Sequence, residues 1–332
     1  MSESEFDIIK TYFTHIGASP DWPEWLTTGI GDDAAVLNTH PEEQLLISID
    51  TLNVGVHFLD DTQPEDIGYK ALAVNVSDIA AMGGQPVWFT LAISLPTVDH
   101  DWLKGFSTGL SEMATQHNIK LVGGDTTRGP LSITIQIAGQ IPTNQALKRS
   151  GAKPGDDIYV TGTLGNAAAG LKLLQQDLSE FDTHQQMLID SLHRPSPRVE
   201  VGLALRKLAT ACIDISDGLV GDLGHILEES MIVSDIIGAE LNIECIPLSE
   251  SLQQSGLAVD VQNELALHGG DDYELCFTAP QSARAAIEAI SQQTACHITK
   301  IGSIISEQGL FVIDKEQRKA ITKTGFDHFG EL

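Results

Sequence analysis

Aspartates next to small residues, most often glycine, recur along the chain at the edges of apolar runs. Six short motifs show this pattern: "GIGDDAAV", "ISIDTL", "NVSDIAAMG", "VGGDTTRG", "IDISDG" and "HGGDDYEL". Taken singly, each motif fits a turn or a helix cap, because Asp and Gly favour those positions. Together, on different elements, they would bring many carboxylates to one place. Carboxylates without His or Cys select hard cations, Mg²⁺ first where phosphate is also bound, so we expect a site for several Mg²⁺ ions and a polyphosphate.

Several other kinds of site are excluded by motifs that the chain lacks. None of the 11 histidines pairs at metal-ligand spacing near the acidic motifs, which argues against zinc. The sequence has no GxxxxGK[ST], no GxGxxG after a strand and no kinase HRD/DFG set. The stretch "GTLGNAAAG" (162–170) has two interpretations, an anion site at a helix start or a tight strand–helix turn. No Ser or Cys lies in a nucleophile elbow, so we expect no covalent nucleophile.

Charge and composition exclude two classes of partner. The 332 residues include 19 basic and 46 acidic side chains, and the formal net charge of -27 repels nucleic acid and anionic membranes. The hydrophobic fraction of 42% is typical of a globular protein, and no apolar run is long enough to span a bilayer. The opening "MSESEFDIIK" has acids where a signal peptide is basic, and the four cysteines form no CxxC pair. We therefore expect a cytoplasmic protein with reduced thiols.

Apolar periodicity predicts the elements that hold these motifs. In the first half we expect helices at 5–17, 65–84 and 99–118, and strands at 44–52 (ending at Asp50), 86–96, 119–127 and 131–141. A basic, Gly- and Pro-containing stretch at 146–157 predicts a connection between two domains. In the second half we expect strand–turn–helix units at 157–174 and 211–230, a Pro-broken loop and helix at 193–205, and strands near 275–280 and 297–305. Strands and helices do not alternate regularly, so each half is expected to be α+β or mixed α/β.

Nine motifs, in order and spanning nearly the whole chain, resemble those of the thiamine-monophosphate kinase family. They are "GIGDDAAVL", "ISIDTLNVGVHF", "YKALAVNVSDIAAMGG", "LVGGDTTRGPLSITI", "RSGAKPGDDIYVTGTLG", "RPSPR", "IDISDGL", "GGDDYEL" and "GFDHF". That family is a branch of the superfamily that includes aminoimidazole ribonucleotide synthetase. The resemblance implies ATP-dependent phosphorylation of thiamine monophosphate to thiamine diphosphate. It also implies a two-domain aminoimidazole ribonucleotide synthetase-like fold: an N-terminal α/β domain (1–146), whose mixed sheet forms a barrel with that of a second copy in a homodimer, and a C-terminal α+β domain (147–332) that closes the cleft.

Roles carried over motif by motif are implied by this resemblance. The Mg²⁺ ligands would be Asp33, Ser48, Ile49 (through its main chain), Asp50, Asp78, Asp125, Asp214 and Asp217. The ATP contacts would be Gly124, Asp125, Arg149 and Ser216. The thiamine monophosphate contacts would be His57, Asp271 and Phe326. Asp271 stands where the family motif "GGEDYEL" has a longer Glu, and Lys323 and Thr324 stand where some members have a Trp. Of the adjacent acids, Asp33 is preferred to Asp32, because consecutive residues in an extended chain point opposite ways.

The implied chemistry needs no general base. A phosphate monoester has a second pKa near 6, so its attacking oxygen is already mostly ionised at neutral pH. Catalysis then consists of positioning two anions and neutralising their charge, which Mg²⁺ ions and cations such as Arg149 would do. Two alternatives stay open at this point: another ATP-using synthetase of the same superfamily, and a non-catalytic metal–nucleotide sensor on this fold. Selenophosphate synthetase is disfavoured, because no Cys lies in the N-terminal half.

Overall fold

The computed structural model describes residues 5–17, 23–30, 34–176, 180–231 and 236–321. Asp32, Asp33 and Phe326 lie outside these described residues. The chain forms two compact units. Unit 1 comprises Met1–Ile79 and Gly84–Asn144, and unit 2 comprises Ala80–Gly83 and Gln145–Leu332. In the described part, no helix is long and apolar enough to cross a membrane.

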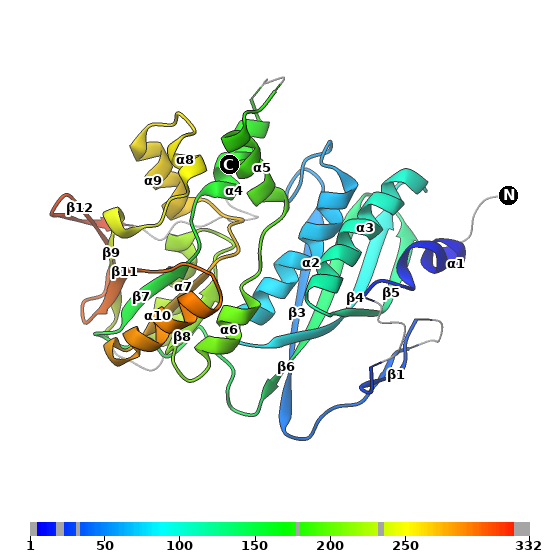
Figure 1. Cartoon of the computed structure of the whole chain (residues 1–332), viewed down its shortest axis with the longest axis horizontal. Helices are drawn as coiled ribbons and strands as arrows, with labels where there is room; N and C mark the ends of the chain where they lie inside the picture. The colour runs from blue at the N-terminus through cyan, green and yellow to red at the C-terminus, as the bar shows by residue number, and fades with distance from the viewer. Residues whose placement is uncertain (1–4, 18–22, 31–33, 177–179, 232–235, 322–332) are drawn as a thin grey trace. The chain divides into compact units, whose positions relative to one another are not determined.

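Unit 1 is built on a four-stranded mixed sheet with two long helices on one of its faces (Figure 1). Its elements are α1 (Glu5–Ile8), the π-helical turn η1 (Ile9–Phe13), β1 (Leu26–Thr28), β2 (Val36–Leu37), β3 (Glu43–Asn53), α2 (Pro64–Ala81, of which the last two residues group with unit 2), β4 (Gln85–Leu95), α3 (His100–Gln116), β5 (Lys120–Arg128) and β6 (Ser132–Pro142). The strand order is β3-β6-β4-β5, with only β4 and β5 parallel. The parallel pair is possible because α3 connects the two strands as a crossover.

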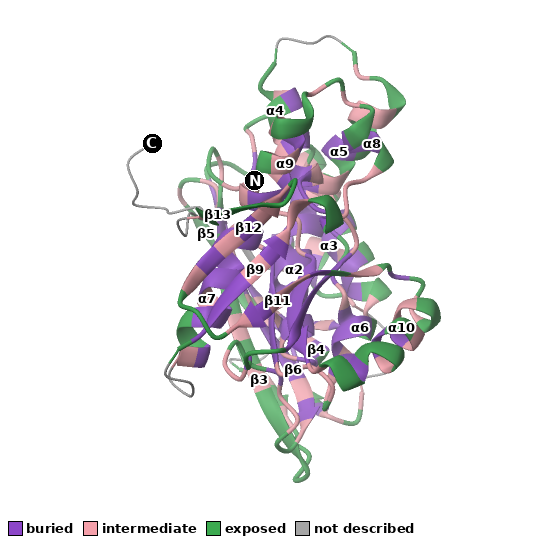
Figure 2. Ribbon diagram, turned by 90° about the vertical axis from the view of Figure 1, so that its left-hand side faces the viewer, coloured by how far each residue is buried: buried purple, intermediate pink, exposed green. Residues whose placement is uncertain are grey.

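Helices α2 and α3 approach each other closely because glycines face the contact. A Cβ atom at Gly68 would collide with the carbonyl oxygen of Phe106, and one at Gly109 would collide with that of Glu65. Helix α2 is buried over most of its length (Figure 2), as its many apolar and small residues predict. The largest fully buried side chains of this unit include Phe89 and Phe106.

One sequence prediction in this unit is wrong. The strand expected to end at Asp50 continues to Asn53, so Asp50 lies inside β3 rather than at its end. The ladder to β6 explains the difference, because Asp50 is paired opposite Ile135 and the pairing runs on to Asn53 and Ser132. Asp125 likewise lies inside β5, opposite Ala92. An aspartate beside an apolar run therefore does not mark the end of a strand in this unit.

Unit 2 is an α+β unit on a seven-stranded sheet. Its elements are β7 (Asp157–Thr161), α4 (Asn166–Leu174), α5 (Thr183–His193), α6 (Val199–Leu205), β8 (Ala211–Asp214), α7 (Leu219–Met231), β9 (Gly238–Asn242), η2 (Ile243–Cys245), α8 (Glu250–Gln253), α9 (Val259–His268), β10 (Leu275–Ala279), η3 (Gln281–Ala283), α10 (Arg284–Gln293), β11 (Ile298–Ile305), β12 (Gly309–Asp314) and β13 (Gln317–Ile321). The order is β13-β12-β9-β11-β7-β10-β8, and all neighbours are antiparallel except β12 and β9.

Both faces of the central strands of this sheet are covered. On β7, Ile158 and Val160 belong to the core cluster on the α7 side, whereas Tyr159 belongs to the cluster on the side of α6 and α10. Every residue of β7, β8 and β10 is buried as a result. A strand buried on both faces needs no apolar–polar alternation, and "DIYVT", "ACID" and "LCFTA" show none. The mixed sheet of unit 1 and the α+β organisation of unit 2 agree with the expected fold class.

Candidate active site

The acidic side chains predicted for unit 1 include a directly paired set. Asp50 on β3 interacts with Asp78 in the last turns of α2, and the hydroxyl of Ser48 donates to Asp78. Burial, followed by the charge of Asp78 and the hydrogen bond to it, raises the pKa of Asp50 to about 7. Two neighbouring carboxylates repel each other unless a proton or a cation lies between them.

The pleat of β3 decides which of its residues join this pair. Ser48 and Asp50 are two residues apart, so both side chains leave the strand on the face that α2 covers. The side chain of Ile49 leaves on the opposite face and is 62% exposed. Any contribution of Ile49 beside Ser48 and Asp50 would therefore come from its main chain, as predicted.

Asn75 is a residue that the sequence reasoning missed. Its amide nitrogen donates to the carbonyl of Ala71, but its Oδ1 is fully buried with no hydrogen-bond partner among the described residues. Two contacts show how α2 runs along β3: Asp78 meets Ser48, and Lys70 Nζ donates to the carbonyl oxygen of His57, 3.2 Å away. Asn75 lies between Lys70 and Asp78 on α2, and it is therefore next to the part of β3 that follows Ser48. An Asn one turn before Asp78, within the mostly apolar stretch "ALAVNVSDIAA", was the signal in the sequence.

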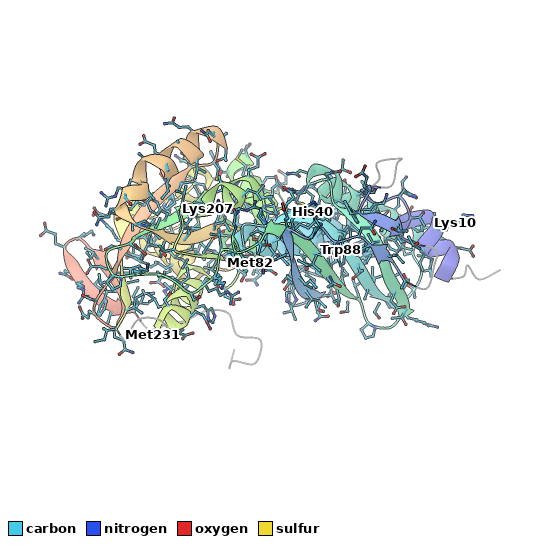
Figure 3. All side chains as sticks on the ribbon, turned by 90° about the horizontal axis from the view of Figure 1, so that it is seen from below. Lys10, His40, Met82, Trp88, Lys207 and Met231 are labelled. Carbon is cyan, nitrogen blue, oxygen red and sulfur yellow. The ribbon has the colours of Figure 1, made fainter. Side chains whose placement is uncertain are left out.

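Asp125 lies on the other face of the sheet. It belongs to a row of paired residues, Asp125, Ala92, Thr134 and Thr51, next to the row that contains Asp50. Neighbouring rows point to opposite faces, so the side chains of Asp125 and Asp50 diverge. Asp125 instead lines a cavity of about 720 Å³ together with Gly124, Thr90 and Lys10, the last labelled in Figure 3. Residues 29–30 and 34–35 also line it, and these flank the undescribed residues 31–33.

His57 is fixed in a tight loop after β3. Its ring Nδ1 accepts the backbone N–H of Asn53 at 3.1 Å, and the backbone N–H of His57 donates to the carbonyl of Asn53 at 3.0 Å. A neutral imidazole that accepts at Nδ1 carries its proton on Nε2. His57 is therefore in the tautomer that can donate a hydrogen bond from Nε2.

In unit 2, the acidic turn after β8 is organised by a buried carboxylate. Asp214 ends β8, and the N–H groups of Ser216 and Asp217 both donate to Oδ2 of Asp222, each at 3.0 Å. Burial and the charge of Asp217 raise the pKa of Asp222 to about 7, while the positive charge of Arg149 acts in the opposite direction. The predicted nucleotide residues Arg149 and Ser216 thus lie close to the same turn.

The loop that carries Asp271 is bound to this turn. The N–H of Asp271 donates to the carbonyl of Ser216 at 2.9 Å, and that of Tyr273 donates to the carbonyl of Ile215 at 2.8 Å. The backbone at Asp271 is left-handed, with φ of 68°, and the hydroxyl of Tyr273 donates to its Oδ1 at 3.1 Å. The structure therefore brings Asp271 next to Ser216, as the predicted common site requires.

The anion-site interpretation of "GTLGNAAAG" is wrong. The N–H groups of Gly165 and Ala167, at the start of α4, donate to the carboxylate of Asp272 at 2.7 and 3.3 Å. Burial raises the pKa of Asp272 to about 8, with the two N–H groups acting against it. The stretch is the tight strand–helix turn of the other interpretation, and an internal acid takes the place that an anionic ligand would need.

Glu274 has a different function from its acidic neighbours. Arg198, at the end of "RPSPR", binds it through two hydrogen bonds of 2.5 and 2.6 Å, and the hydroxyl of Thr161 donates to it at 2.6 Å. Glu274 is buried, and a Cβ atom at Gly162 would collide with its carboxylate. This acid holds β7, β10 and the loop before α6 together.

Two sets of predicted site residues are brought together, whereas Gly124 and Asp125 line the cavity on the other face of the unit 1 sheet and His57 lies in the loop after β3. Ser48, Asp50 and Asp78 are brought together in unit 1, and Arg149, Ser216, Asp217 and Asp271 lie around one turn in unit 2. Across the described ranges, no three His, Cys, Asp or Glu side chains converge tightly enough to hold a metal ion by themselves. The oxygen-only set of Ser48, Asp50 and Asp78, with the unpartnered Oδ1 of Asn75 one turn away, nevertheless suits a hard cation.

Comparisons with known proteins show the family of the chain. Residues 31–141 match the family model for the N-terminal domain of AIR synthase related proteins, and residues 153–315 match that for the C-terminal domain. The chain is 47% identical to the thiamine-monophosphate kinase of Salmonella typhimurium over 99% of both chains. The chain belongs to the thiamine-monophosphate kinase family.

Two solved structures of the family show the same fold. The crystal structure of thiamine-monophosphate kinase from Stenotrophomonas maltophilia K279a has a TM-score of 0.82 and 46% identity, and the match covers 87% of this chain and 91% of that one. The structure of AaThiL complexed with AMPPCP and TMP has a TM-score of 0.76 and 33% identity, and the match covers 91% and 93%. The expected fold class and family are confirmed.

Proposed function

We propose that this protein transfers the γ-phosphoryl group of ATP to thiamine monophosphate and releases thiamine diphosphate and ADP. The observation that carries the proposal is the interacting pair of acids Asp50 and Asp78 in a chain that matches a thiamine-monophosphate kinase over its full length. The family member AaThiL was solved with AMPPCP, an ATP analogue, and with TMP, which supports the same two ligands here.

Several Mg²⁺ ions are proposed as the cofactor. Asp50, Asp78 and Ser48 in unit 1 supply oxygen ligands, and the buried, unpartnered Oδ1 of Asn75 fits a hydrated cation beside them. The remaining ligands are proposed to be Asp33, Ile49 (main chain), Asp125, Asp214 and Asp217. When bound, the ions neutralise the charge of two phosphate-bearing substrates.

The chain's own residues bind and orient the two substrates. Gly124, Asp125, Arg149 and Ser216 are proposed to contact ATP, and His57, Asp271 and Phe326 to contact thiamine monophosphate. His57 would donate from Nε2 to the substrate phosphate, because Nδ1 already accepts the N–H of Asn53. No side chain is assigned as a nucleophile or as a general base, since the acceptor phosphate is already ionised at neutral pH. Transfer is therefore proposed to be direct and in line.

A homodimer is proposed to form through the uncovered face of the unit 1 sheet. Leu45, Ile47 and Ile49 of the edge strand β3 are 46%, 62% and 62% exposed on that face. The half-buried Trp88 of β4, labelled in Figure 3, belongs to the same row of paired residues as Ile47. An apolar edge strand in a sheet invites pairing with another chain. Sedimentation should give a dimer at micromolar concentration, and a double change of Ile47 and Ile49 to Lys should give a monomer, whereas Val259→Lys in unit 2 should not.

The decisive experiment is the direct assay of the reaction. Purified protein with Mg²⁺, ATP and thiamine monophosphate should produce thiamine diphosphate and ADP in equal amounts. Incubation with γ-labelled ATP alone should leave no label on the protein, because the transfer is direct. A folded, ATP-binding sample that forms no thiamine diphosphate would refute the proposed function. A cytoplasmic location is proposed as well, and the four free cysteines in the structure suit that compartment.

A further inference from the structure

The side chain of Asp222, in the first turn of α7, accepts hydrogen bonds from the loop that precedes the helix. Asp222 is the fourth residue of α7, and its own N–H is bonded within the helix, to the carbonyl of Gly218 at 2.9 Å. Helical side chains lean toward the N-terminus, so its carboxylate extends past the first turn. There a single oxygen, Oδ2, accepts both the N–H of Ser216 and the N–H of Asp217 at 3.0 Å.

This turn contains the only two residues between Ala211 and Gly224 that are not fully buried. From Ala211 to Gly224, every residue is buried except Ser216 and Asp217. Asp222 itself is 2% exposed. The N–H groups of Ser216 and Asp217 follow the last residue of β8, so the sheet ladder does not hold them. The position of one buried oxygen therefore decides where these two half-buried residues lie.

The same turn also locates the loop of Asp271. The carbonyl of Ser216 accepts the N–H of Asp271, and a Cβ atom at Gly270 would collide with that carbonyl. On the other side of the turn, a Cβ atom at Gly218 would run into the backbone of His268. A displacement of the turn would consequently be passed on to Asp271.

We propose that Asp222 is a positioning residue for phosphoryl transfer, which acts by holding the main chain of Ser216 and Asp217. The inference rests on the proposed function, in which Ser216 contacts ATP and Asp217 binds Mg²⁺. Asp222 touches neither substrate. Its contribution is a hydrogen-bond acceptor, Oδ2, at a fixed position, so the position of this acceptor matters more than its negative charge.

Two substitutions separate geometry from charge. Asp222→Asn keeps an oxygen at the same distance from the backbone and removes the charge, whereas Asp222→Glu keeps the charge and moves the oxygen by one methylene. We expect Asp222→Asn to keep kcat and the half-saturating Mg²⁺ concentration within about tenfold of the unmodified protein, because it loses only the charge assistance of two hydrogen bonds. We expect Asp222→Glu to lose about 100-fold in kcat, the scale of a misplacement by about 1 Å, and to need more Mg²⁺.

The controls separate this role from a purely structural one. Asp182→Glu makes the same change at an exposed acid that accepts a backbone N–H at the start of α5, and it should leave kcat and the Mg²⁺ requirement unchanged. Assays are run at a temperature where circular dichroism shows each variant to be folded. If Asp222→Glu does not fold, the Asn variant decides: an equal loss in Asp222→Asn and Asp217→Asn would overturn the proposal. So would a Glu variant at least as active as the Asn variant. Absence of turnover in the unmodified protein would instead refute the proposed function, before any variant is compared.

Discussion

Asp50 of β3 and Asp78 of α2 form an interacting pair of acids, in which burial and the charge of Asp78 raise the pKa of Asp50 to about 7. The two residues come from elements that are joined by a loop and are held face to face by the packing of α2 on the sheet. Acids in such a pair act against folding and are retained where a ligand uses them.

Changing either acid of this pair should separate activity from stability. Asp50→Asn and Asp78→Asn should each lower turnover by at least about 100-fold, because charge stabilisation worth several kcal/mol depends on both acids. Without Mg²⁺, the melting temperature of Asp50→Asn should be unchanged or higher, since the cost of burying this acid beside Asp78 is removed. Calorimetry and the coupled assay for ADP measure the two effects. Glu43→Gln, at the exposed start of β3, is the matched control, and full activity in either Asn variant would contradict the proposed site.

The buried acid Asp157 predicts a loss of stability at low pH. Arg284 and Lys300 bind its carboxylate at 2.5 and 2.7 Å, and the hydrogen bond from Arg284 is the main reason that the pKa of Asp157 falls to about 2. Its folded-state pKa is depressed below that of the unfolded chain, so its contribution is present above about pH 4 and is lost as the pH falls toward 2. Asp157→Asn should lower the free energy of unfolding by about 1–3 kcal/mol at pH 7.

Urea titrations at pH 7 and pH 3 test this sign. The difference between the unmodified protein and Asp157→Asn should shrink at pH 3, because the native Asp157 is then losing its advantage. Glu307→Gln, which removes an exposed acid paired with Arg318, should change stability little at either pH. A difference for Asp157→Asn that grows toward low pH would show that the sign is wrong.

The acid at the start of α4 should act as a helix cap. Asp272→Ala should destabilise the protein by about 1–2 kcal/mol, and Asp272→Asn by less, because Asn also accepts the N–H groups of Gly165 and Ala167. Hydrogen exchange at these two amides should be faster in the Ala variant alone. Unchanged exchange there would mean that the amides have another acceptor in solution.

The ion pair of Arg198 and Glu274 should be costly to break from one side. Arg198→Met leaves the 6%-exposed Glu274 without its cationic partner and should cost about 3 kcal/mol. Exchanging both residues for apolar ones should cost less than the sum of the single changes, and a double-mutant cycle in urea measures that coupling. Additive effects would show that the two residues do not stabilise each other.

Much of the fold could be predicted because its strongest signals are local. The alternation in "EQLLISIDTLN" identifies the strand β3, and the long, mostly apolar stretch "EDIGYKALAVNVSDIAA" identifies the helix α2. The place of Asp50 within its strand could not be predicted, since it depends on a ladder with β6, far away in the sequence. The same holds for the face of the sheet on which Asp125 lies.

The candidate site shows a similar division. The acidic motifs indicated Asp50, Asp78 and Asp217, because ligand chemistry restricts the residue types. Asp222, Asp272 and Glu274 belong to the same or neighbouring motifs, but they bind the chain itself. A carboxylate that accepts a backbone N–H cannot be distinguished by type from one that binds a metal ion. Only their tertiary partners separate the two groups.

The pairing of β3 also has a consequence for the newly made chain on the ribosome. Among the described residues, the ladder partner of β3 is β6, and Glu43 is joined to Pro142. At synthesis rates of about 5–20 residues per second, β3 must wait several seconds for its partner to emerge. During that interval the strand with Leu45, Ile47 and Ile49 has both edges open. We expect nascent chains stopped between β3 and β6 to be held by chaperones, and chains extended past Pro142 to be released from them.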